Sequence, residues 1–121
     1  MGDDRKTPAG AVSFLVLYAR DMSETVAFYT GLGLAFQSEQ HGAGPKHYCC
    51  QLDALALEIY PSEGGDIGGS AMVGIKVANL DRLKLPQNNI VAQTAPFGDG
   101  WRVIIKDPDG RNVFLFEADH A

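Results

Sequence analysis

The chain has 121 residues, of which 45% are hydrophobic and 21% charged, and these shares are typical of one folded domain. Its net charge of −5 and the lack of clustered Lys and Arg argue against a nucleic-acid partner, since phosphate binding depends on grouped basic side chains. Without an apolar run of about 18 residues, and with polar residues at 1–10, the sequence predicts neither a membrane span nor a secretory signal, and we expect a cytoplasmic protein.

The first half of the chain predicts a strand, a helix and three further strands. Residues 11–19 form an apolar, β-rich run, and Asp21 and Glu24 then have the spacing of a capping box, which predicts a helix start. Gly31 and Gly33 predict its end, because glycine tolerates the positive φ of a helix C-terminus. The further strands are expected at about 34–39, 46–52 and 55–61.

Within the second of these strands, Cys49 and Cys50 are adjacent. Neighbouring residues of a strand point to opposite faces, so this pair suits neither a redox CxxC motif nor an internal disulfide. We expect two reduced thiols that are buried as small apolar side chains.

The second half repeats the order of the first. The glycine-rich stretch at 64–69 predicts a linker, and a strand at about 71–78 and a short helix near 80–85, ended by Pro86, follow it. FLVLYARDM from Phe14 aligns with MVGIKVANL from Met72, and QLDALALEIY from Gln51 aligns with DPDGRNVFLF from Asp107, at nearly the same offset. This repeat predicts a duplicated βαβββ module within a single domain. Module one covers about 11–63 and module two about 70–118, with the last strands near 89–94, 101–106 and 112–117.

Two hairpin turns determine which residues share a face. Asp107-Pro108-Asp109-Gly110 predicts a type I turn with a glycine bulge, which places Ile104 opposite Phe114. The same three-residue loop in module one would place Tyr48 opposite Glu58, whereas a two-residue loop would place Cys49 there.

The sequence has an ordered pattern over about residues 12–118: an apolar strand, a D-x-x-E helix start with FYTGLGL, then LEIYP, then DPDG before a final strand. This pattern resembles the vicinal oxygen chelate superfamily, which includes glyoxalase I, bleomycin-resistance proteins, fosfomycin-resistance enzymes and extradiol dioxygenases. HGAGPKHY at 41–48, with LEIYP, also resembles a subgroup of uncharacterised glyoxalase-like proteins. The resemblance implies an α+β fold in which two βαβββ modules form a curved mixed β-sheet cup, the glyoxalase/bleomycin resistance/dioxygenase fold.

In the metal-dependent members, side chains at four equivalent strand positions hold a divalent ion. The resemblance assigns these positions to Phe14, Glu58, Met72 and Phe114, where such members carry His or Gln, an acidic residue, His and Glu. Only Glu58 matches the ligand type of its position, and a catalytic zinc needs about three protein ligands. The resemblance therefore implies a protein without a metal or other cofactor, closest to the bleomycin-resistance branch, which sequesters a ligand without transforming it.

Strand alternation assigns a mostly aromatic set of side chains to the cup, as is typical of small-molecule sites. Glu58 either contacts the ligand or forms a salt bridge with Lys76 or Arg102, and those two cations either meet an anionic ligand group or lie solvated at the strand edge. Trp101 either lines the cup mouth or packs elsewhere, and His120 has no predicted role. The candidate ligand-binding residues are Phe14, Tyr48, Glu58, Tyr60, Met72, Lys76, Arg102, Ile104 and Phe114, with Val16, Tyr18 and Phe116 beside them.

Three functional hypotheses remain, and the sequence leaves open whether the chain is an enzyme. The first is metal-free binding of a small apolar or aromatic molecule. The second is a divalent-metal-dependent lyase or dioxygenase with unconventional ligands, drawn from His41, His47 and Glu58. The third is a non-catalytic interaction module. Because the short helix near 80–85 leaves the underside of module two poorly covered, we expect a homodimer, with the cup closed either within one chain or across two.

Overall fold

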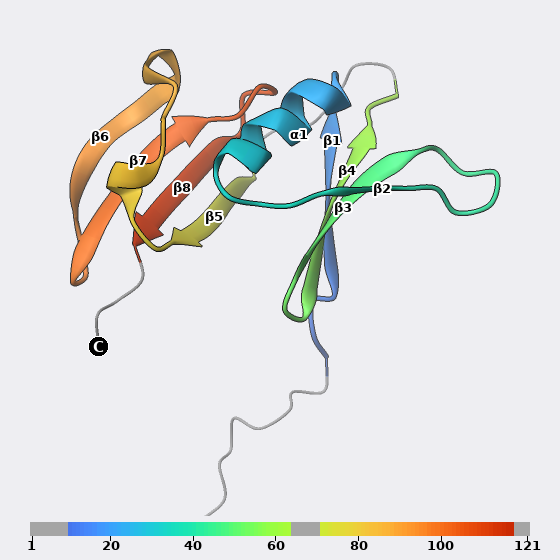
Figure 1. The fold of residues 1–121 in the computed structure, drawn as a ribbon, viewed down its shortest axis with the longest axis horizontal. Coiled ribbons are helices and arrows are strands. Elements are labelled where there is room, and N and C mark those ends of the chain that lie inside the picture. Colours follow the sequence, from blue (N-terminus) through green and yellow to red (C-terminus); the bar gives the residue numbers. More distant parts are fainter. Residues whose placement is uncertain (1–9, 64–70, 118–121) are drawn as a thin grey trace, which may run out of the picture.

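The computed structural model describes residues 10–63 and 71–117 (Figure 1) and has the predicted α+β architecture. The predicted linker at 64–69 lies outside the described residues. The elements of module one are β1 (Phe14–Ala19), α1 (Met22–Gly31), β2 (Gln37–Glu39), β3 (His47–Leu52) and β4 (Leu55–Pro61). Those of module two are β5 (Met72–Val77), η1 (Leu80–Arg82), η2 (Gln87–Asn89), β6 (Ile90–Phe97), β7 (Gly100–Lys106) and β8 (Asn112–Glu117).

The two modules build two four-stranded sheets of equivalent topology. The first sheet has the order β1-β4-β3-β2 and the second β5-β8-β7-β6. In each sheet the first strand of the module pairs in parallel with the last, and the remaining pairs are antiparallel. The equivalent order and pairing confirm the internal repeat that the sequence predicted.

Local signals determine both ends of α1, as predicted. The side chain of Asp21 accepts a 3.2 Å hydrogen bond from the backbone N–H of Glu24, which satisfies one of the free donors of the first turn. At the other end, Gly33 has a φ of 104°, and its N–H donates to the carbonyl of Thr30 while that of Leu34 donates to Tyr29. These two bonds form a Schellman motif, for which glycine is the preferred residue.

The short helix predicted near 80–85 forms only in part, as a single 3-10 turn. Only the short 3-10 segment η1 forms there, and Leu83 already has extended backbone with a φ of −93° and a ψ of 138°. Six residues before Pro86 are too few to offset the cost of helix nucleation, and the residue before a proline disfavours the α conformation. Asn79 caps η1 through a 2.9 Å hydrogen bond from the N–H of Asp81.

One hydrophobic core joins both modules. Side chains from the inner faces of the two sheets are buried in it, and Tyr29 of α1, which is 0% exposed, belongs to the same cluster. In Figure 1, α1 lies at the boundary between the two sheets. The sheets contribute Leu17, Leu57 and Ile59 from module one and Val103, Ile105, Val113 and Leu115 from module two.

The turn after β7 ties module two to α1. The N–H of Gly110, whose φ is 89°, donates to the carbonyl of Asp107, as expected for the predicted turn. The carboxylate of Asp107 also accepts hydrogen bonds from the Tyr29 hydroxyl at 2.7 Å and from Nε of Arg111 at 2.8 Å. The hydroxyl of Thr25, also on α1, donates a 3.0 Å hydrogen bond to the carboxylate of Asp109. The turn motif is therefore also the contact through which the modules are joined.

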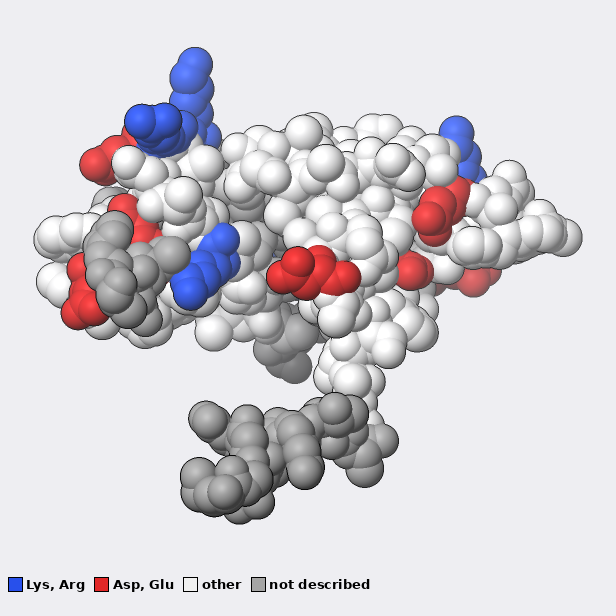
Figure 2. Space-filling model, turned by 60° about the horizontal axis from the view of Figure 1, so that its bottom comes forward, with Lys and Arg blue, Asp and Glu red and all other residues white. Residues whose placement is uncertain are grey.

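The surface agrees with the charge pattern of the sequence. On the face that Figure 2 shows, Lys and Arg form separate small groups, and no continuous basic stripe crosses the described part of that face. Among the described residues, no helix is long and apolar enough to cross a membrane.

Candidate functional site

The side of the first sheet that faces away from the core carries the predicted cup residues of module one, and we call it the first cup face. Phe14, Glu58 and Tyr60 lie on it, because each alternates along its strand with a core residue such as Leu57 or Ile59. Phe14 is 60% exposed. Val16 and Tyr18 are opposite Glu58 and Tyr60 in the parallel pair, so they share this face.

Tyr48 does not lie on the first cup face, which corrects the prediction. The β3–β4 hairpin has a two-residue turn, in which Asp53 has a φ of 46°, so Cys49 is opposite Glu58 and Tyr48 is opposite Ile59. Tyr48 therefore packs against the core. A one-residue change in loop length exchanges the two faces of a strand. Asp53 itself was a signal for the shorter loop, since Asp tolerates the left-handed conformation that such turns require.

The outward side of the second sheet, the second cup face, carries the predicted residues of module two. Ile104 lies opposite Phe114, as the turn motif predicted. Met72, Lys76 and Arg102 share the face through the same pairings. Met72 is 57% exposed, so much of this face is open to solvent in a single chain.

Three phenylalanine rings form an aromatic cluster on the second cup face. The ring of Phe97 lies 5.1 Å from that of Phe114 and 5.6 Å from that of Phe116, both with edge-to-face geometry. Phe114 and Phe116 are 5.9 Å apart. The sequence analysis missed Phe97, because the strand that it predicted near 89–94 ends three residues before β6 does.

The charged groups of the cup faces are not paired with one another. Among the described residues, Glu58 forms no ion pair with Lys76 or Arg102, and Arg102 instead donates a 2.6 Å hydrogen bond to the carbonyl of Gln93. Desolvation raises the pKa of the Tyr60 phenol above its ordinary value, and Glu58 adds to the shift through its charge and a hydrogen bond. Glu58 and Tyr60 thus form a polar pair on an otherwise apolar face.

The four positions that the family resemblance assigns to a metal do not fit one in this chain. Phe14, Met72 and Phe114 offer no nitrogen or oxygen donor, and Cys49, beside Glu58, is a poor substitute. Desolvation raises the pKa of the Cys49 thiol, and the charges of Glu39 and Glu58 raise it further, so the thiol keeps its proton at neutral pH. Both cysteines are free thiols, and Cys50 is buried as predicted. Cys49 is only partly buried, which corrects the prediction, because it lies on the outward side of the sheet opposite Glu58.

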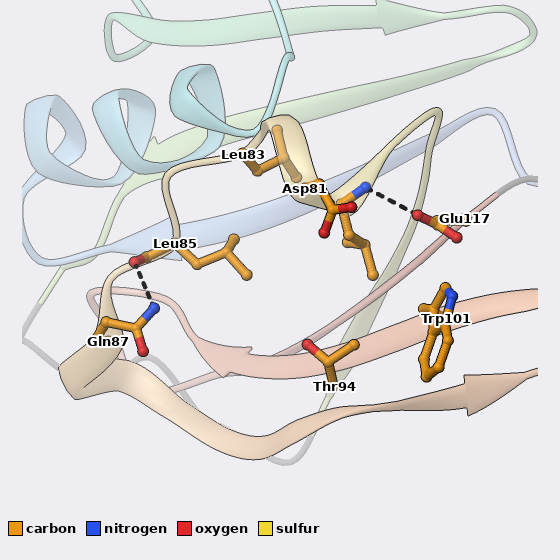
Figure 3. Close-up of a pocket in the computed structure, with 8 residues that line it drawn as sticks. Asp81, Leu83, Leu85, Gln87, Thr94, Trp101 and Glu117 are labelled. Carbon is orange, nitrogen blue, oxygen red and sulfur yellow. Dashed lines mark hydrogen bonds between the residues drawn. The ribbon is translucent and has the colours of Figure 1, made fainter.

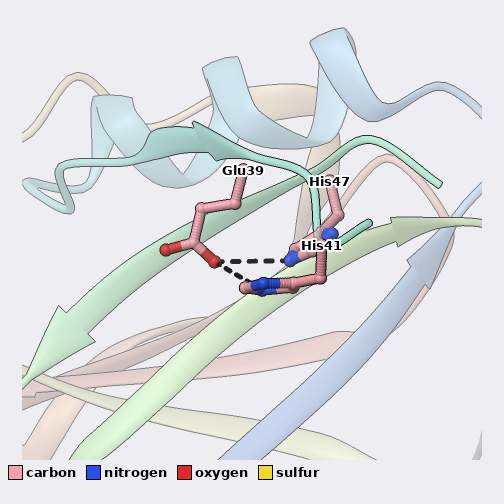
Figure 4. Close-up of side chains that lie close together, drawn as sticks. All are labelled: Glu39, His41 and His47. Atoms are coloured by element: carbon pink, nitrogen blue, oxygen red, sulfur yellow. Dashed lines mark ion pairs between the residues drawn. The ribbon is translucent and has the colours of Figure 1, made fainter. Parts of the chain in front are cut away.

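His47 lies on the first cup face, whereas the predicted register placed it on the helix side. Its ring stacks on Tyr60 with a centroid distance of 4.1 Å. His41 lies beside it, and Glu39, rather than the expected Glu58, completes a cluster of three potential ligands (Figure 4). The sequence analysis missed Glu39 because only the pairing of β2 with β3 brings it opposite His47.

The hollows of the described residues include one on the first cup face and one away from both cup faces. A depression of about 300 Å³ on the first cup face is lined by Gln37, Glu39, Cys49 and Gln51, together with Ala35. A groove of about 520 Å³ lies elsewhere, between η1 and the second sheet (Figure 3). Trp101, which is half exposed, lines this groove and not the cup mouth, together with Leu80, Leu83, Leu85 and Glu117.

The comparisons with known proteins support the fold. No protein-family model matches the chain, and no curated protein matches it. TnmS3, an antibiotic-binding protein from Streptomyces sp. CB03234, matches with a TM-score of 0.68 at 16% identity, over 93% of this chain and 99% of that chain. A glyoxalase/bleomycin resistance protein/dioxygenase from Nocardioides matches with a TM-score of 0.63 at 16% identity, over 97% of this chain and 89% of that chain. Hypothetical protein SA1046 from S. aureus matches with a TM-score of 0.67 at 15% identity, over 91% of this chain and 98% of that chain.

Proposed function

The chain has the glyoxalase/bleomycin resistance/dioxygenase fold of the vicinal oxygen chelate superfamily, and we propose that it binds a small apolar or aromatic molecule against its cup faces. The observation that carries this proposal is the partly exposed aromatic cluster of Phe97, Phe114 and Phe116 on the second cup face. Aromatic rings stack on flat ligands at little conformational cost. The proposed binding uses no metal at Phe14, Glu58, Met72 and Phe114, since three of these side chains have no nitrogen or oxygen donor.

We propose further that a second copy of the chain completes the cup. Both cup faces point away from the core that the two modules share, so a single chain leaves Phe14 and Met72 more than half exposed. Exposed apolar surface of this kind is typical of association sites. In a homodimer, the first cup face of one copy would lie over the second cup face of the other. Light scattering at micromolar concentration should give about twice the monomer mass of 13.0 kDa, and a monomeric mass would contradict this assembly.

Glu58 and Tyr60 would supply the polar contacts of the ligand. A phenol that keeps its proton donates a hydrogen bond, and a carboxylate accepts one, so the pair can recognise a hydroxyl or amine on an otherwise apolar molecule. Lys76 could meet an anionic group, while Arg102 is partly engaged by Gln93. The antibiotic-binding neighbour TnmS3 makes aromatic antibiotics a sensible first set of probes.

A binding assay with matched variants tests the proposal. Thermal shifts against a panel of antibiotics and aromatic acids would identify a ligand, and calorimetry would then compare the wild type with Phe114→Ala and Trp101→Ala. Loss of at least about tenfold in affinity in Phe114→Ala, with Trp101→Ala unchanged, is expected, because a buried aromatic contact contributes about 1.4 kcal/mol or more. The opposite pattern would place the ligand in the groove beside η1 and would refute the cup.

Two other functions remain as outcomes of the same experiments. A panel without any ligand, together with a stable dimer, would favour a non-catalytic interaction module. Turnover of a bound ligand that requires an added divalent metal would favour a lyase or dioxygenase.

A further inference from the structure

Three potential metal ligands meet where β2 ends and β3 begins. Oε1 of Glu39 lies 3.3 Å from Nε2 of His47 and 3.4 Å from Nε2 of His41 (Figure 4). Each of the three residues can place a ligand atom within 4.8 Å of those of the other two. The cluster shares no residue with the four cup positions discussed above.

The buried ring of His47 presents an atom that lacks a partner. The side chain is 1% exposed, and Nδ1 lies 3.1 Å from the carbonyl oxygen of Pro45. A carbonyl only accepts, so this contact favours the tautomer with the proton on Nδ1 and a lone pair on Nε2. Nε2 is buried, lies 3.3 Å from Oε1 of Glu39 and has no hydrogen-bond partner among the described residues. A buried polar atom without a partner is rare and calls for an explanation such as a bound ion.

A metal ion satisfies this arrangement better than a proton does. Although Nε2 of His47 is close to Glu39, the contact does not have hydrogen-bond geometry, so a proton on Nε2 would not point at the carboxylate. In a tetrahedral zinc site with ligand bonds of about 2.0–2.1 Å, neighbouring ligand atoms lie about 3.3–3.4 Å apart. The two distances from Glu39 agree with this spacing. The third distance is the one between the two histidines, and the side chain of His41, which is 73% exposed, has room to adjust it.

We propose that Glu39, His41 and His47 bind one Zn²⁺ ion at the end of the first cup face. Two imidazole nitrogens and one carboxylate favour zinc over calcium or magnesium, which prefer oxygen ligands alone. Three protein ligands leave a fourth position, which opens to solvent beside the exposed His41 and would hold water or an oxygen of a bound molecule.

The surrounding residues hold the ligands in place before any metal binds. The bond to Pro45 orients the ring of His47, as outer contacts of metal-binding histidines commonly do, and Tyr60 stacks on that ring at an interplanar angle of 9°. The N–H of Gly44 donates to the carbonyl of His41, and Gly42 has a φ of 57°, so a tight turn positions His41.

Calorimetry with Zn²⁺ tests the site, using protein that is purified without a histidine tag and stripped with a chelator. The wild type should bind one Zn²⁺ per chain, and Co²⁺ in its place should give visible absorption bands of a tetrahedral site. Glu39→Gln and His41→Ala should each weaken Zn²⁺ binding by at least about tenfold. Both side chains are at least partly exposed, so the variants should fold, and circular dichroism would verify this.

Two control variants make the result specific. Glu58→Gln changes the other carboxylate of the first cup face, and His120→Ala removes the histidine outside the described residues. Both should bind Zn²⁺ like the wild type. The proposal is overturned if the wild type binds no Zn²⁺, if Glu39→Gln and His41→Ala bind it unchanged, or if either control variant loses it. None of these measurements uses a cup ligand, so they stand apart from the test of the proposed function.

Discussion

The hydroxyl of Tyr29 donates a 2.7 Å hydrogen bond to the carboxylate of Asp107, which lies 78 residues further along the chain. Both side chains are almost completely buried, and Nε of Arg111 donates to the same carboxylate oxygen. The bond joins α1 of module one to the turn between β7 and β8 of module two. It therefore links the positions of the two cup faces.

We predict that Tyr29→Phe lowers the free energy of unfolding by about 1.5–3 kcal/mol, the usual contribution of a buried hydrogen bond to a charged group. Urea denaturation would measure this change. Tyr18→Phe is the matched control, since Tyr18 is 50% exposed and water can replace what its hydroxyl contacts. The control should stay within about 0.5 kcal/mol of the wild type. Equal effects of the two substitutions would show that the Tyr29 bond does not stabilise the fold.

The same residue predicts how stability changes at alkaline pH. Desolvation and the hydrogen bond to Asp107 raise the pKa of Tyr29 far above the ordinary value of 10.0. Above that value the unfolded chain has lost the Tyr29 proton and the folded chain keeps it, so the wild type loses stability as the pH rises. Tyr29→Phe lacks this loss, because phenylalanine has no hydroxyl proton to release. The stability difference between wild type and variant should therefore be constant below pH 10.0 and should shrink above it. A difference that stays constant at higher pH would contradict the prediction.

Two glycines at the end of α1 should respond oppositely to alanine. At both Gly31 and Gly33, the position that an alanine Cβ would occupy has no atom within 4 Å, so space does not distinguish them. Gly31 is helical, and Gly31→Ala should stabilise the protein by about 0.5–1 kcal/mol. Gly33 has a φ of 104°, so Gly33→Ala should destabilise it by about 1–3 kcal/mol. Thermal unfolding of the two variants would measure both effects, and a change of the same sign in both would refute the argument from φ.

The hairpin register predicts that a single cysteine is modified in the folded protein. Cys49 is partly exposed and Cys50 is 2% exposed, so iodoacetamide should label Cys49 alone. Desolvation and the neighbouring carboxylates raise the pKa of Cys49 above 9.0, so labelling should be slow at neutral pH and should accelerate as the pH rises through and beyond that value. Mass spectrometry of peptides after timed labelling would identify the site. Preferential labelling of Cys50 would indicate the other register.

Much of the fold follows from local sequence signals. Asp21 with Glu24, and Gly33 after the helix, determined the ends of α1, because caps depend on residues within one turn. The DPDG motif determined the β7–β8 register and hence the partners Ile104 and Phe114. The repeated order of these signals predicted two equivalent modules, and both sheets have that topology.

The candidate site depended more on tertiary structure. Whether Tyr48 or Cys49 faces Glu58 depended on a single turn residue, Asp53, and the same choice moved His47 onto the first cup face. Glu39 reached His47 only through the pairing of β2 with β3, since strand pairing brings together residues that the chain order separates. The sequence by itself determined most of the elements and the apolar side chains at three of the four cup positions, because both depend on residue type and near neighbours. Tertiary structure alone decided the Tyr29–Asp107 bond and the Glu39, His41 and His47 cluster, because these contacts form only when the strands and the two modules pack.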